Sequence, residues 1–315
     1  LAPLHNPVNL RGILECRDKF EGIEQVAVFD TTFHHTLPNV AYTYALPRDT
    51  VDNRVVRKYG FHGISHEYVS CEATDYLKRY HNSSNGSSNG SDGGADNFKI
   101  ISLHLGNGCS ACAIHGGRSI ETSMGMTPLQ GLVMGTRCGD IDPEFIFYTL
   151  RSHDDLVNRD TVYSIEKLLN SKSGLKGICG ANDMRCVIDL MNSGDENGKL
   201  AFDLFCYRIR QYIGSYFVTL GGCDAIVFTA GIGENSAEVR REVCKQLACI
   251  GVELNESLNS NQDHDGRSVR DISAETSRVR VLVVPTDEDK QIAVMGVQLL
   301  SSKDASSGDI LQGEK

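Results

Sequence analysis

Apolar residues recur at intervals of three and four between positions 200 and 220, with polar and charged residues between them. This spacing places the apolar side chains on one face of an α-helix, which has 3.6 residues per turn. The predicted buried face consists of Leu200, Phe205, Ile209, Tyr212, Ile213, Tyr216 and Leu220. We expect the aromatic members of this face to pack in a core rather than to form a ligand site.

Shorter runs earlier in the chain have the composition of β-strands. Residues 99–104 and 109–115 are two such runs, and the glycine-containing segment 106–108 between them predicts a tight turn. Gly116 and Gly117 open a third run that ends at Thr122. The three runs predict an antiparallel meander.

A strand followed by glycines and then by a helix is predicted later in the chain. Residues 223–229 form a short apolar run, residues 231–235 read as a glycine loop, and residues 236–247 have helical spacing behind an Asn or Ser cap. A strand, a glycine loop and a helix in this order could bind a nucleotide. A dinucleotide-binding interpretation is weaker, because a third glycine and an acidic residue about 20 positions later are missing. Together with the meander, this unit predicts mixed α/β domains.

Composition narrows the class of protein. The 315 residues are 40% hydrophobic and 23% charged, which is ordinary for a globular chain long enough for two domains. A net charge of -10 argues against a nucleic-acid partner. Apolar runs of the roughly 18 residues that span a bilayer are missing, so we expect no membrane partner. Residues 82–96 are rich in Ser, Asn and Gly and predict a flexible surface insertion.

The number and spacing of the cysteines indicate the cellular compartment of the protein. Eleven cysteines without paired spacing favour reduced thiols and a cytoplasmic protein, although a chain that begins at Leu1 leaves organelle targeting open. The tight pair Cys109 and Cys112 lies in a strand pattern, where residues three apart face opposite sides. We expect both thiols to be packing groups rather than redox or zinc ligands.

Two glycine-rich segments could bind phosphate. In the hairpin 104–108, glycines let backbone N–H groups approach an anion, although any hairpin can use an Asn-Gly turn. In the segment 134–143, Arg137 stands among glycines and could present its guanidinium to a phosphoryl group. The alternative for Arg137 is a surface salt bridge with Asp140 or Asp142.

Histidines and acidic residues form the remaining candidates. His62 and His66 are four residues apart, but no acidic partner accompanies them and Gly63 weakens a helix there, so a zinc site is not expected. Asp30 and Glu288 follow the β-like runs 25–29 and 279–284, where they could hold Mg2+ or could be turn and cap residues.

Six segments taken in order are more specific than any one of them. They are VFDTTFHHTLP, RKYGFHGISHEYVS, HLGNGCSACAI, TSMGMTPLQGLVMGTRCGDIDP, FTAGIGENSAEVR and VPTDEDK. This series resembles the acetate and propionate kinase family over nearly the whole chain. The resemblance implies the actin-like, ribonuclease H-like ASKHA fold. It also implies that 1–31 and 289–315 are remnants of an incomplete first domain, while 32–288 form the C-terminal nucleotide-binding domain.

The resemblance assigns roles residue by residue. Arg137, His104 and His62 would stabilise the transferring phosphoryl group, Asp30 would lie near the nucleophile, and Glu288 would bind the metal. The nucleotide would contact Asn107, Gly135, Asp183, Met184, Arg185, Gly231, Gly233 and Asn235. The acetate methyl would enter a pocket of Leu4, Phe61 and Pro128.

The implied activity is direct in-line phosphoryl transfer from ATP to acetate, giving ADP and acetyl phosphate, with Mg2+ as cofactor. Family membership also implies a homodimer. The family carries about a third of its length upstream of the segment that matches Leu1, including a phosphate loop and an arginine. The alternative is therefore a catalytically inactive nucleotide-binding fragment or an interaction protein.

Overall fold

A six-stranded mixed sheet forms the centre of the computed structural model, which describes residues 6–47, 56–84, 97–152, 158–261 and 266–310. The order of the strands is β3-β2-β1-β4-β6-β5. Their bounds are β1 Lys99–Leu105, β2 Cys109–His115, β3 Arg118–Thr122, β4 Ala225–Thr229, β5 Arg270–Asp271 and β6 Arg280–Val283. Strands β1, β4 and β6 run parallel, whereas β2, β3 and β5 pair antiparallel with their neighbours.

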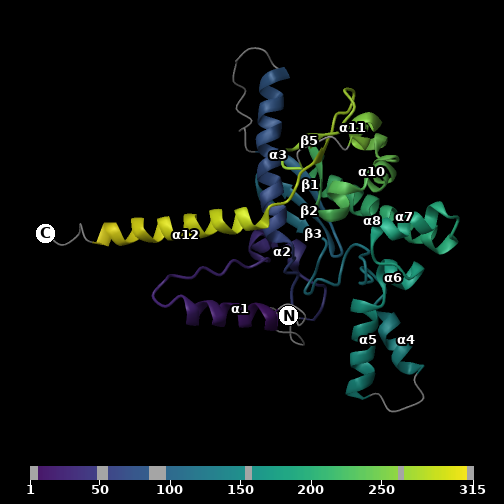
Figure 1. Ribbon diagram of the computed structural model, residues 1–315, viewed down its shortest axis with the longest axis horizontal. Helices are drawn as coiled ribbons and strands as arrows, with labels where there is room; N and C mark the ends of the chain where they lie inside the picture. The colour runs from purple at the N-terminus through teal and green to yellow at the C-terminus, as the bar shows by residue number, and fades with distance from the viewer. Residues whose placement is uncertain (1–5, 48–55, 85–96, 153–157, 262–265, 311–315) are drawn as a thin grey trace.

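Helices lie on both faces of this sheet and around its edges (Figure 1). They are α1 Asn6–Lys19, α2 Asn39–Tyr42, α3 Gly63–Ser84, α4 Glu144–Arg151, α5 Arg159–Ser171, α6 Gly174–Cys179, α7 Met184–Asn192, α8 Glu196–Leu220, α9 Ala230–Asn235, α10 Ala237–Cys244, α11 Glu256–Ser260 and α12 Glu288–Ile310, with 3-10 turns at Thr32–Thr36 and Ala248–Ile250. Among the described residues, no helix is both long and apolar enough to cross a bilayer.

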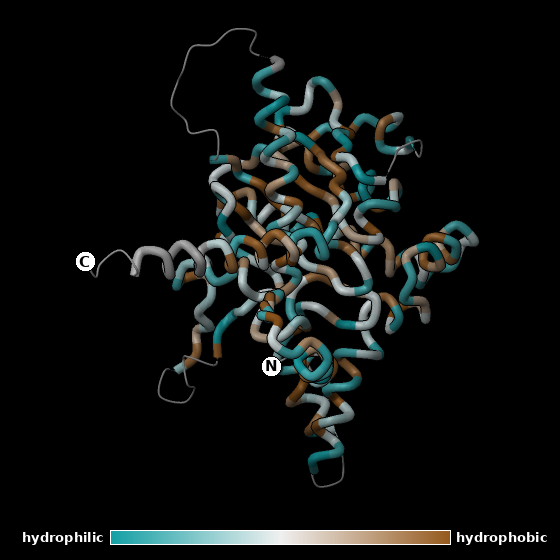
Figure 2. Tube along the Cα trace, turned by 60° about the vertical axis from the view of Figure 1, so that its left-hand side comes forward, coloured by the Kyte–Doolittle hydropathy of each residue, from teal (hydrophilic) through white to brown (hydrophobic). Residues whose placement is uncertain are grey.

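Alternation along the strands divides the core into two layers. Ile101, Leu103 and Leu105 of β1 pack in a cluster with residues of α8, whereas Ile100 packs with residues of α3. Successive side chains of a strand point to opposite faces, so Ser102 and His104 also face α3. Figure 2 shows apolar stretches both in the central strands and in the peripheral helices. The α3 face of the sheet therefore mixes apolar packing with polar side chains.

Most of the predicted elements are confirmed. The meander of β1, β2 and β3 forms with the register His104 opposite Ser110. Helix α8 covers the predicted stretch, and five of the seven predicted face residues are buried. Leu200 is instead 57% exposed, and Tyr212 is half-buried with its hydroxyl donating to Asp140 Oδ2 at 2.5 Å. Leu200 lies in the first turns of the helix, whereas Tyr212 still packs against the core cluster.

Two local predictions are wrong. Residues 231–235 form part of helix α9 rather than a glycine loop, because the Glu234 Oε1 atom accepts the Ala230 N–H at 2.8 Å and closes the turn after β4. The following helix α10 has the expected cap, since Ser236 Oγ accepts from Val239 N. Residues 25–29 are not a strand; no neighbouring strand within the described ranges pairs with them, and Phe29 is 66% exposed.

The ends of the described chain carry exposed apolar side chains. They occur on α1, in the segment that follows it and on α12: Val8, Leu10, Ile13, Leu14, Phe20, Ile23, Phe29, Ile292, Val294, Val297 and Leu299. The expected insertion 82–96 begins inside α3, which continues to Ser84, and 85–96 lie outside the described residues. Leu4 lies outside them too.

Candidate active site

The parallel strands β1, β4 and β6 end at one edge of the sheet, and the candidate residues follow these ends. The β1–β2 hairpin, helix α9 and the segment before α12 all start there. Ligands of open α/β sheets bind outside the carboxyl ends of such strands. The topology thus gathers segments that are more than 100 residues apart in the sequence.

Two histidines form the centre of the site. The rings of His62 and His104 are stacked with centroids 4.0 Å apart and an interplanar angle of 20°. His104 extends from β1 and hydrogen-bonds through Nδ1 to Ser65 Oγ at 2.8 Å. Burial, followed by the neighbouring His62, lowers the pKa of His104 well below its usual value, while Asp30 acts in the opposite direction. His104 is therefore a neutral ring at pH 7.

The backbone of His62 adopts a left-handed conformation with φ of 56°. Asp30 stabilises it, because Asp30 Oδ2 accepts the His62 N–H at 2.7 Å and the Asp30 carbonyl accepts the Gly63 N–H at 2.8 Å. A Cβ at Gly63 would lie 2.3 Å from that carbonyl oxygen. Strained backbone conformations of non-glycine residues are enriched at functional sites. Asp30 thus positions the His62 backbone in addition to any role at the metal.

Arg137 faces the same space as His62. A Cβ built on Gly108 would lie 3.4 Å from His62 Nε2 and 3.5 Å from Arg137 Nη1, so the glycine keeps the gap between them open. Arg137 Nη1 donates to the Pro128 carbonyl at 2.9 Å. Burial lowers the pKa of the guanidinium, which remains charged because an ordinary arginine titrates above about 12.

The alternative of a surface salt bridge for Arg137 is wrong. Asp140 accepts hydrogen bonds from Gly131 N and the Tyr212 hydroxyl, and Asp142 accepts from Glu144 N. Within the described residues, the ion pairs do not include Arg137. The guanidinium is a cation without a carboxylate partner there, which suits an anionic ligand.

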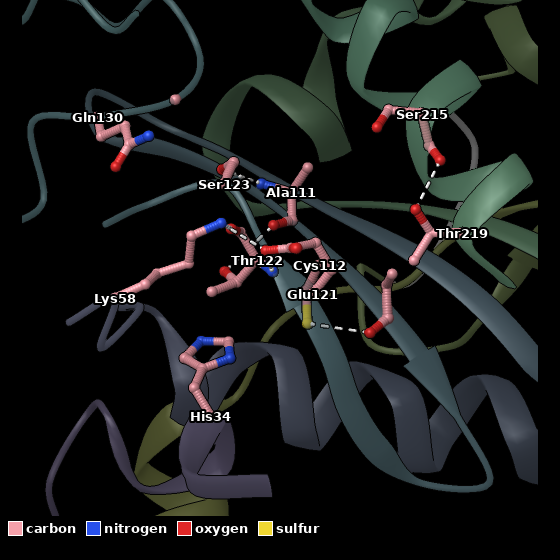
Figure 3. A network of polar contacts seen from close by, with 12 residues as sticks. His34, Lys58, Ala111, Cys112, Glu121, Thr122, Ser123, Gln130, Ser215 and Thr219 are labelled. Carbon is pink, nitrogen blue, oxygen red and sulfur yellow. Dashed lines mark hydrogen bonds and ion pairs between the residues drawn. The ribbon is translucent and has the colours of Figure 1, made fainter. Parts of the chain in front are cut away.

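A half-buried ion pair anchors the segment that leads into His62. Lys58 Nζ contacts Glu121 Oε1 at 2.5 Å and the Thr122 carbonyl at 3.0 Å. Figure 3 shows the Lys58 side chain reaching to Glu121 and Thr122 on β3, with His34 near this network. His34 in turn hydrogen-bonds Ser119 Oγ and the Phe61 carbonyl. The residues just before His62 are therefore attached to the sheet at several points.

A cavity of about 660 Å³ opens beside this cluster. Six of the expected nucleotide residues line it, namely Asn107, Asp183, Met184, Arg185, Gly231 and Asn235. Further lining residues without an individual sequence signal are Asn182, Ile188, Asp189, Ile232, Ser236 and Glu238. Arg185 Nη2 pairs with Asp183 Oδ2 at 2.5 Å on the exposed rim. The β1–β2 hairpin, α7 and α9 all contribute to its wall.

Gly135 and Gly233 do not line this cavity. A Cβ at Gly135 would lie 2.1 Å from Asn107 Oδ1, so the glycine makes room for the Asn107 side chain. Gly233 is buried, and a Cβ there would lie 3.3 Å from the Phe228 carbonyl carbon. Both glycines are closely packed, Gly135 against Asn107 and Gly233 against Phe228, and their contact with a nucleotide stays a prediction.

The acidic residues fit a hard divalent cation. Burial raises the pKa of Glu288 at the start of α12, and Asp30 followed by Asp289 raises it further. The described residues contain no group of three metal-ligating side chains. Mg2+ commonly uses only one or two carboxylates and completes its coordination with water and substrate phosphates, so the expectation that Glu288 holds the metal stays a prediction.

Phe61 and Pro128 flank the cluster in different surroundings. Phe61 lines an apolar cavity of about 1180 Å³ together with residues of α1 and of the segment 23–31. Pro128 is not among the lining residues and instead contacts Arg137 through its carbonyl. The pocket of Leu4, Phe61 and Pro128 expected for an acetate methyl stays a prediction, since Leu4 lies outside the described residues.

Several polar residues of the cluster have no distinctive sequence signal. Ser65, Ser102 and Ser110 all hydrogen-bond to histidine rings. Ser65 lies in the first turn of α3, whereas Ser102 and Ser110 lie on β1 and β2 on the face of His104, so the strand register could have suggested the role of these two serines. Cys109 and Cys112 are fully buried on β2, and burial raises the pKa of each thiol to about 12, as expected for packing groups.

The sheet topology and the location of the site define an ASKHA-type fold. The chain belongs to the acetokinase family, whose model matches residues 1–294. It is 47% identical over 312 residues to an acetate kinase of Syntrophobacter fumaroxidans, covering 98% of this chain and 70% of the relative. An acetate kinase of Campylobacter jejuni is 46% identical over 299 residues, which cover 95% of this chain and 70% of that relative. The protein is therefore a phosphotransferase.

Solved structures agree with this family. The Porphyromonas gingivalis acetate kinase superposes with a TM-score of 0.82 at 39% identity, covering 95% of this chain and 69% of that one. A propionate kinase from Francisella tularensis superposes with a TM-score of 0.79 at 40% identity, covering 92% of this chain and 68% of that one. The predicted family and fold are thus confirmed.

Proposed function

We propose that the protein transfers a phosphoryl group reversibly from ATP to acetate, giving ADP and acetyl phosphate, and thus uses a carboxyl group as acceptor. The observation that carries this proposal is the convergence of His62, His104 and Arg137 around Gly108, at the edge where the nucleotide-sized cavity opens. The names of the most similar relatives support acetate as acceptor.

Positioning and charge stabilisation account for the chemistry. The transferring phosphoryl group spreads negative charge over three oxygens, and fixed donors in a partly buried site stabilise that charge. A guanidinium has five N–H donors, so the bond from Arg137 to Pro128 leaves others for those oxygens. The His62 and His104 rings would flank the same group and exclude water from one side.

Asp30 and Glu288 would hold Mg2+, which supplies charge neutralisation to the phosphates when bound. The phosphate chain would run along the hairpin at Asn107, and the adenosine would occupy the cavity lined by Met184, Gly231 and Asn235. Phe61 and Pro128 would border the acetate. Backbone N–H groups of the glycine hairpin would complete the anion site.

We propose a cytoplasmic homodimer without nucleic-acid or membrane partners, in which ATP rather than pyrophosphate is the donor. The proposed boundaries separate 32–288, as the nucleotide-binding domain, from 1–31 and 289–315. A nucleotide cavity on the 32–288 part supports that division.

Arg137→Ala tests the proposal. Loss of the guanidinium removes charge stabilisation that is present mainly in the transition state, so acetyl phosphate formation, detected as the hydroxamate, should fall at least about 100-fold. Arg151→Ala is the matched control, since Arg151 lies exposed on α4 and, within the described residues, forms its ion pair with Glu144. Equal activity of both variants would refute the role of Arg137, and absence of any acetyl phosphate with the unaltered chain would refute the activity.

A further inference from the structure

A series of hydrogen bonds connects helix α9, which lines the cavity of about 660 Å³, to the His104 ring. Thr286 is the middle member and lies in the segment between β6 and α12. Its backbone N–H donates to Glu234 Oε1 at 3.1 Å, and its hydroxyl donates to Ser65 Oγ at 2.9 Å. Ser65 Oγ in turn lies 2.8 Å from His104 Nδ1. The series therefore joins the wall of the cavity to a member of the histidine cluster.

The Glu234 carboxylate holds one end of this series. Its Oε1 atom accepts the Ala230 N–H at 2.8 Å, the Thr229 hydroxyl at 3.4 Å and the Thr286 N–H at 3.1 Å. Ala230 has a φ of 63°, and a non-glycine residue keeps such a conformation only where its surroundings hold it. One carboxylate oxygen thus fixes the start of α9 and the segment that leads into α12 relative to each other.

The Ser65 hydroxyl has a local alternative to its contact with Thr286. Ser65 is fully buried in the first turn of α3, and a serine in a helix can donate to a backbone carbonyl three or four residues earlier. Ser70 of the same helix does so, because its hydroxyl donates to the Glu67 carbonyl at 2.8 Å. Ser65 is held between Thr286 and His104 instead. The Thr286 hydroxyl therefore opposes rotation of the serine toward its own helix.

The hydrogen bond to Ser65 decides the orientation of the His104 ring. His104 is 8% exposed, and within the described residues its ring hydrogen-bonds only Ser65. The ring also stacks on His62 with centroids 4.0 Å apart. A rotation of χ2 by half a turn keeps the plane of the ring, and hence the stacking, but exchanges the Nδ1 edge with the Cδ2 edge. Stacking alone cannot distinguish these two orientations, whereas the contact with Ser65 can.

We propose that Thr286 is a positioning residue that selects, through Ser65, the orientation of the His104 ring and fixes it relative to α9. The effect on rate rests on the proposed function, in which His104 stabilises a phosphoryl group from a nucleotide bound beside α9. A misplacement of about 1 Å can lower the rate of such a transfer about 100-fold. Thr286 need not touch the substrate. It acts on where the Nε2 atom of His104 lies when the nucleotide is bound.

Replacement of the Thr286 hydroxyl tests this role. In Thr286→Val, kcat for acetyl phosphate formation should fall about 10-fold, with KM for acetate and ATP within about twofold. Thr286→Ala removes the same hydroxyl without a new methyl beside Ser65 and should have the same effect. Thr286→Ser keeps the hydroxyl and should restore kcat. Unchanged kcat in both Thr286→Val and Thr286→Ala, or no recovery in Thr286→Ser, overturns the proposal.

Thr36→Val is the matched control. Thr36 is likewise a half-buried threonine, and its hydroxyl donates to the Ser119 carbonyl at 2.9 Å, away from His104. Its kcat should equal that of the unaltered chain. A similar fall in kcat in Thr36→Val and Thr286→Val would show that loss of any such hydroxyl lowers the rate, and would overturn the positioning role.

NMR of the histidine rings separates this proposal from the proposed function. The ring signals of His104 are identified by their loss in His104→Gln. They should move in Thr286→Val but not in Thr286→Ser or Thr36→Val. Unchanged His104 signals in Thr286→Val overturn the proposal, whatever the activity. Shifted signals in Thr286→Val, together with no acetyl phosphate formation by the unaltered chain, would refute the proposed function and leave the positioning of His104 intact.

Discussion

Single residues in the site are explained by backbone shape as much as by chemistry. Gly60 has φ of 76°, and a Cβ there would lie 2.5 Å from His34 Cδ2 and 2.7 Å from Thr122 Cγ2. The glycine therefore allows the segment before His62 to pass close to the sheet. Gly139, in the loop of Arg137, also has positive φ and leaves no room for a Cβ beside the Gly131 carbonyl. Sequence alone shows these glycines but not the atoms that require them.

Gly60→Ala should lower the free energy of unfolding by about 2–4 kcal/mol, because strain in the left-handed region adds to overpacking. Gly22→Ala is a close control, since Gly22 has the same φ of 76° but nothing within 4 Å of a built Cβ. The control should cost only about 1–2 kcal/mol. Urea denaturation of both variants measures the difference. An equal loss of unfolding free energy in both variants would mean that contact with the His34 ring does not exclude a Cβ at position 60.

At the scale of elements, the wall of the 660 Å³ cavity depends on a buried arginine. Arg240 of α10 is 2% exposed, and its Nη1 atom donates to the carbonyls of Gly233 and Glu234 at the end of α9. Its Nε and Nη2 atoms bind the side chain and carbonyl of Asn259. Unpaired helix carbonyls are otherwise costly to bury. A one-turn helix that periodicity does not predict is thus stabilised by a residue outside it.

Arg240→Lys should weaken ADP binding about 10-fold, because an ammonium group cannot reach both helix carbonyls and Asn259 in the geometry of a guanidinium. Titration calorimetry with ADP measures this, and acetate KM should change little. The neighbouring Arg241→Lys is the control, as Arg241 pairs with Glu256 at the surface. Unchanged ADP affinity in Arg240→Lys would show that α9 holds its place without this support.

At the scale of the whole molecule, buried histidines link stability to pH. Burial lowers the pKa of His34 to about 4, although the Phe61 carbonyl and Asp30 act in the opposite direction. Burial also lowers the pKa values of His66 and His104 well below the usual range of histidine. All three rings stay neutral in the folded protein while the unfolded chain takes up protons near pH 6.5. Their contribution to stability is therefore present above pH 6.5 and is lost as pH falls towards 4.

Lowering the pH from 7 to 5.5 should reduce the free energy of unfolding by about 3–4 kcal/mol, since three histidines each contribute about 1.3 kcal/mol over this interval. Urea denaturation at the two pH values measures the loss. His34→Gln should decrease the loss by about a third, whereas His35→Gln, at an exposed ring, should not change it. An identical pH dependence in both variants would contradict the burial argument.

Local spacing in the sequence determined the meander, the amphipathic helix α8 and the strands β4 and β6, because these depend on residues within about 25 positions. The ordered motifs identified the family. They also led to the pairing of His62, His104 and Arg137 as one set, which the structure brings together around Gly108.

Only the tertiary structure decided which groups stand behind those side chains. Ser110 is 48 residues from His62 and 44 from His66, and their contacts depend on which face of β2 meets α3. Likewise, Asp30 reaches the His62 backbone across 32 residues, and Arg137 has a carbonyl rather than a carboxylate as its neighbour. Hydrogen-bond partners at such separations follow from sheet register and burial, which no short sequence window contains.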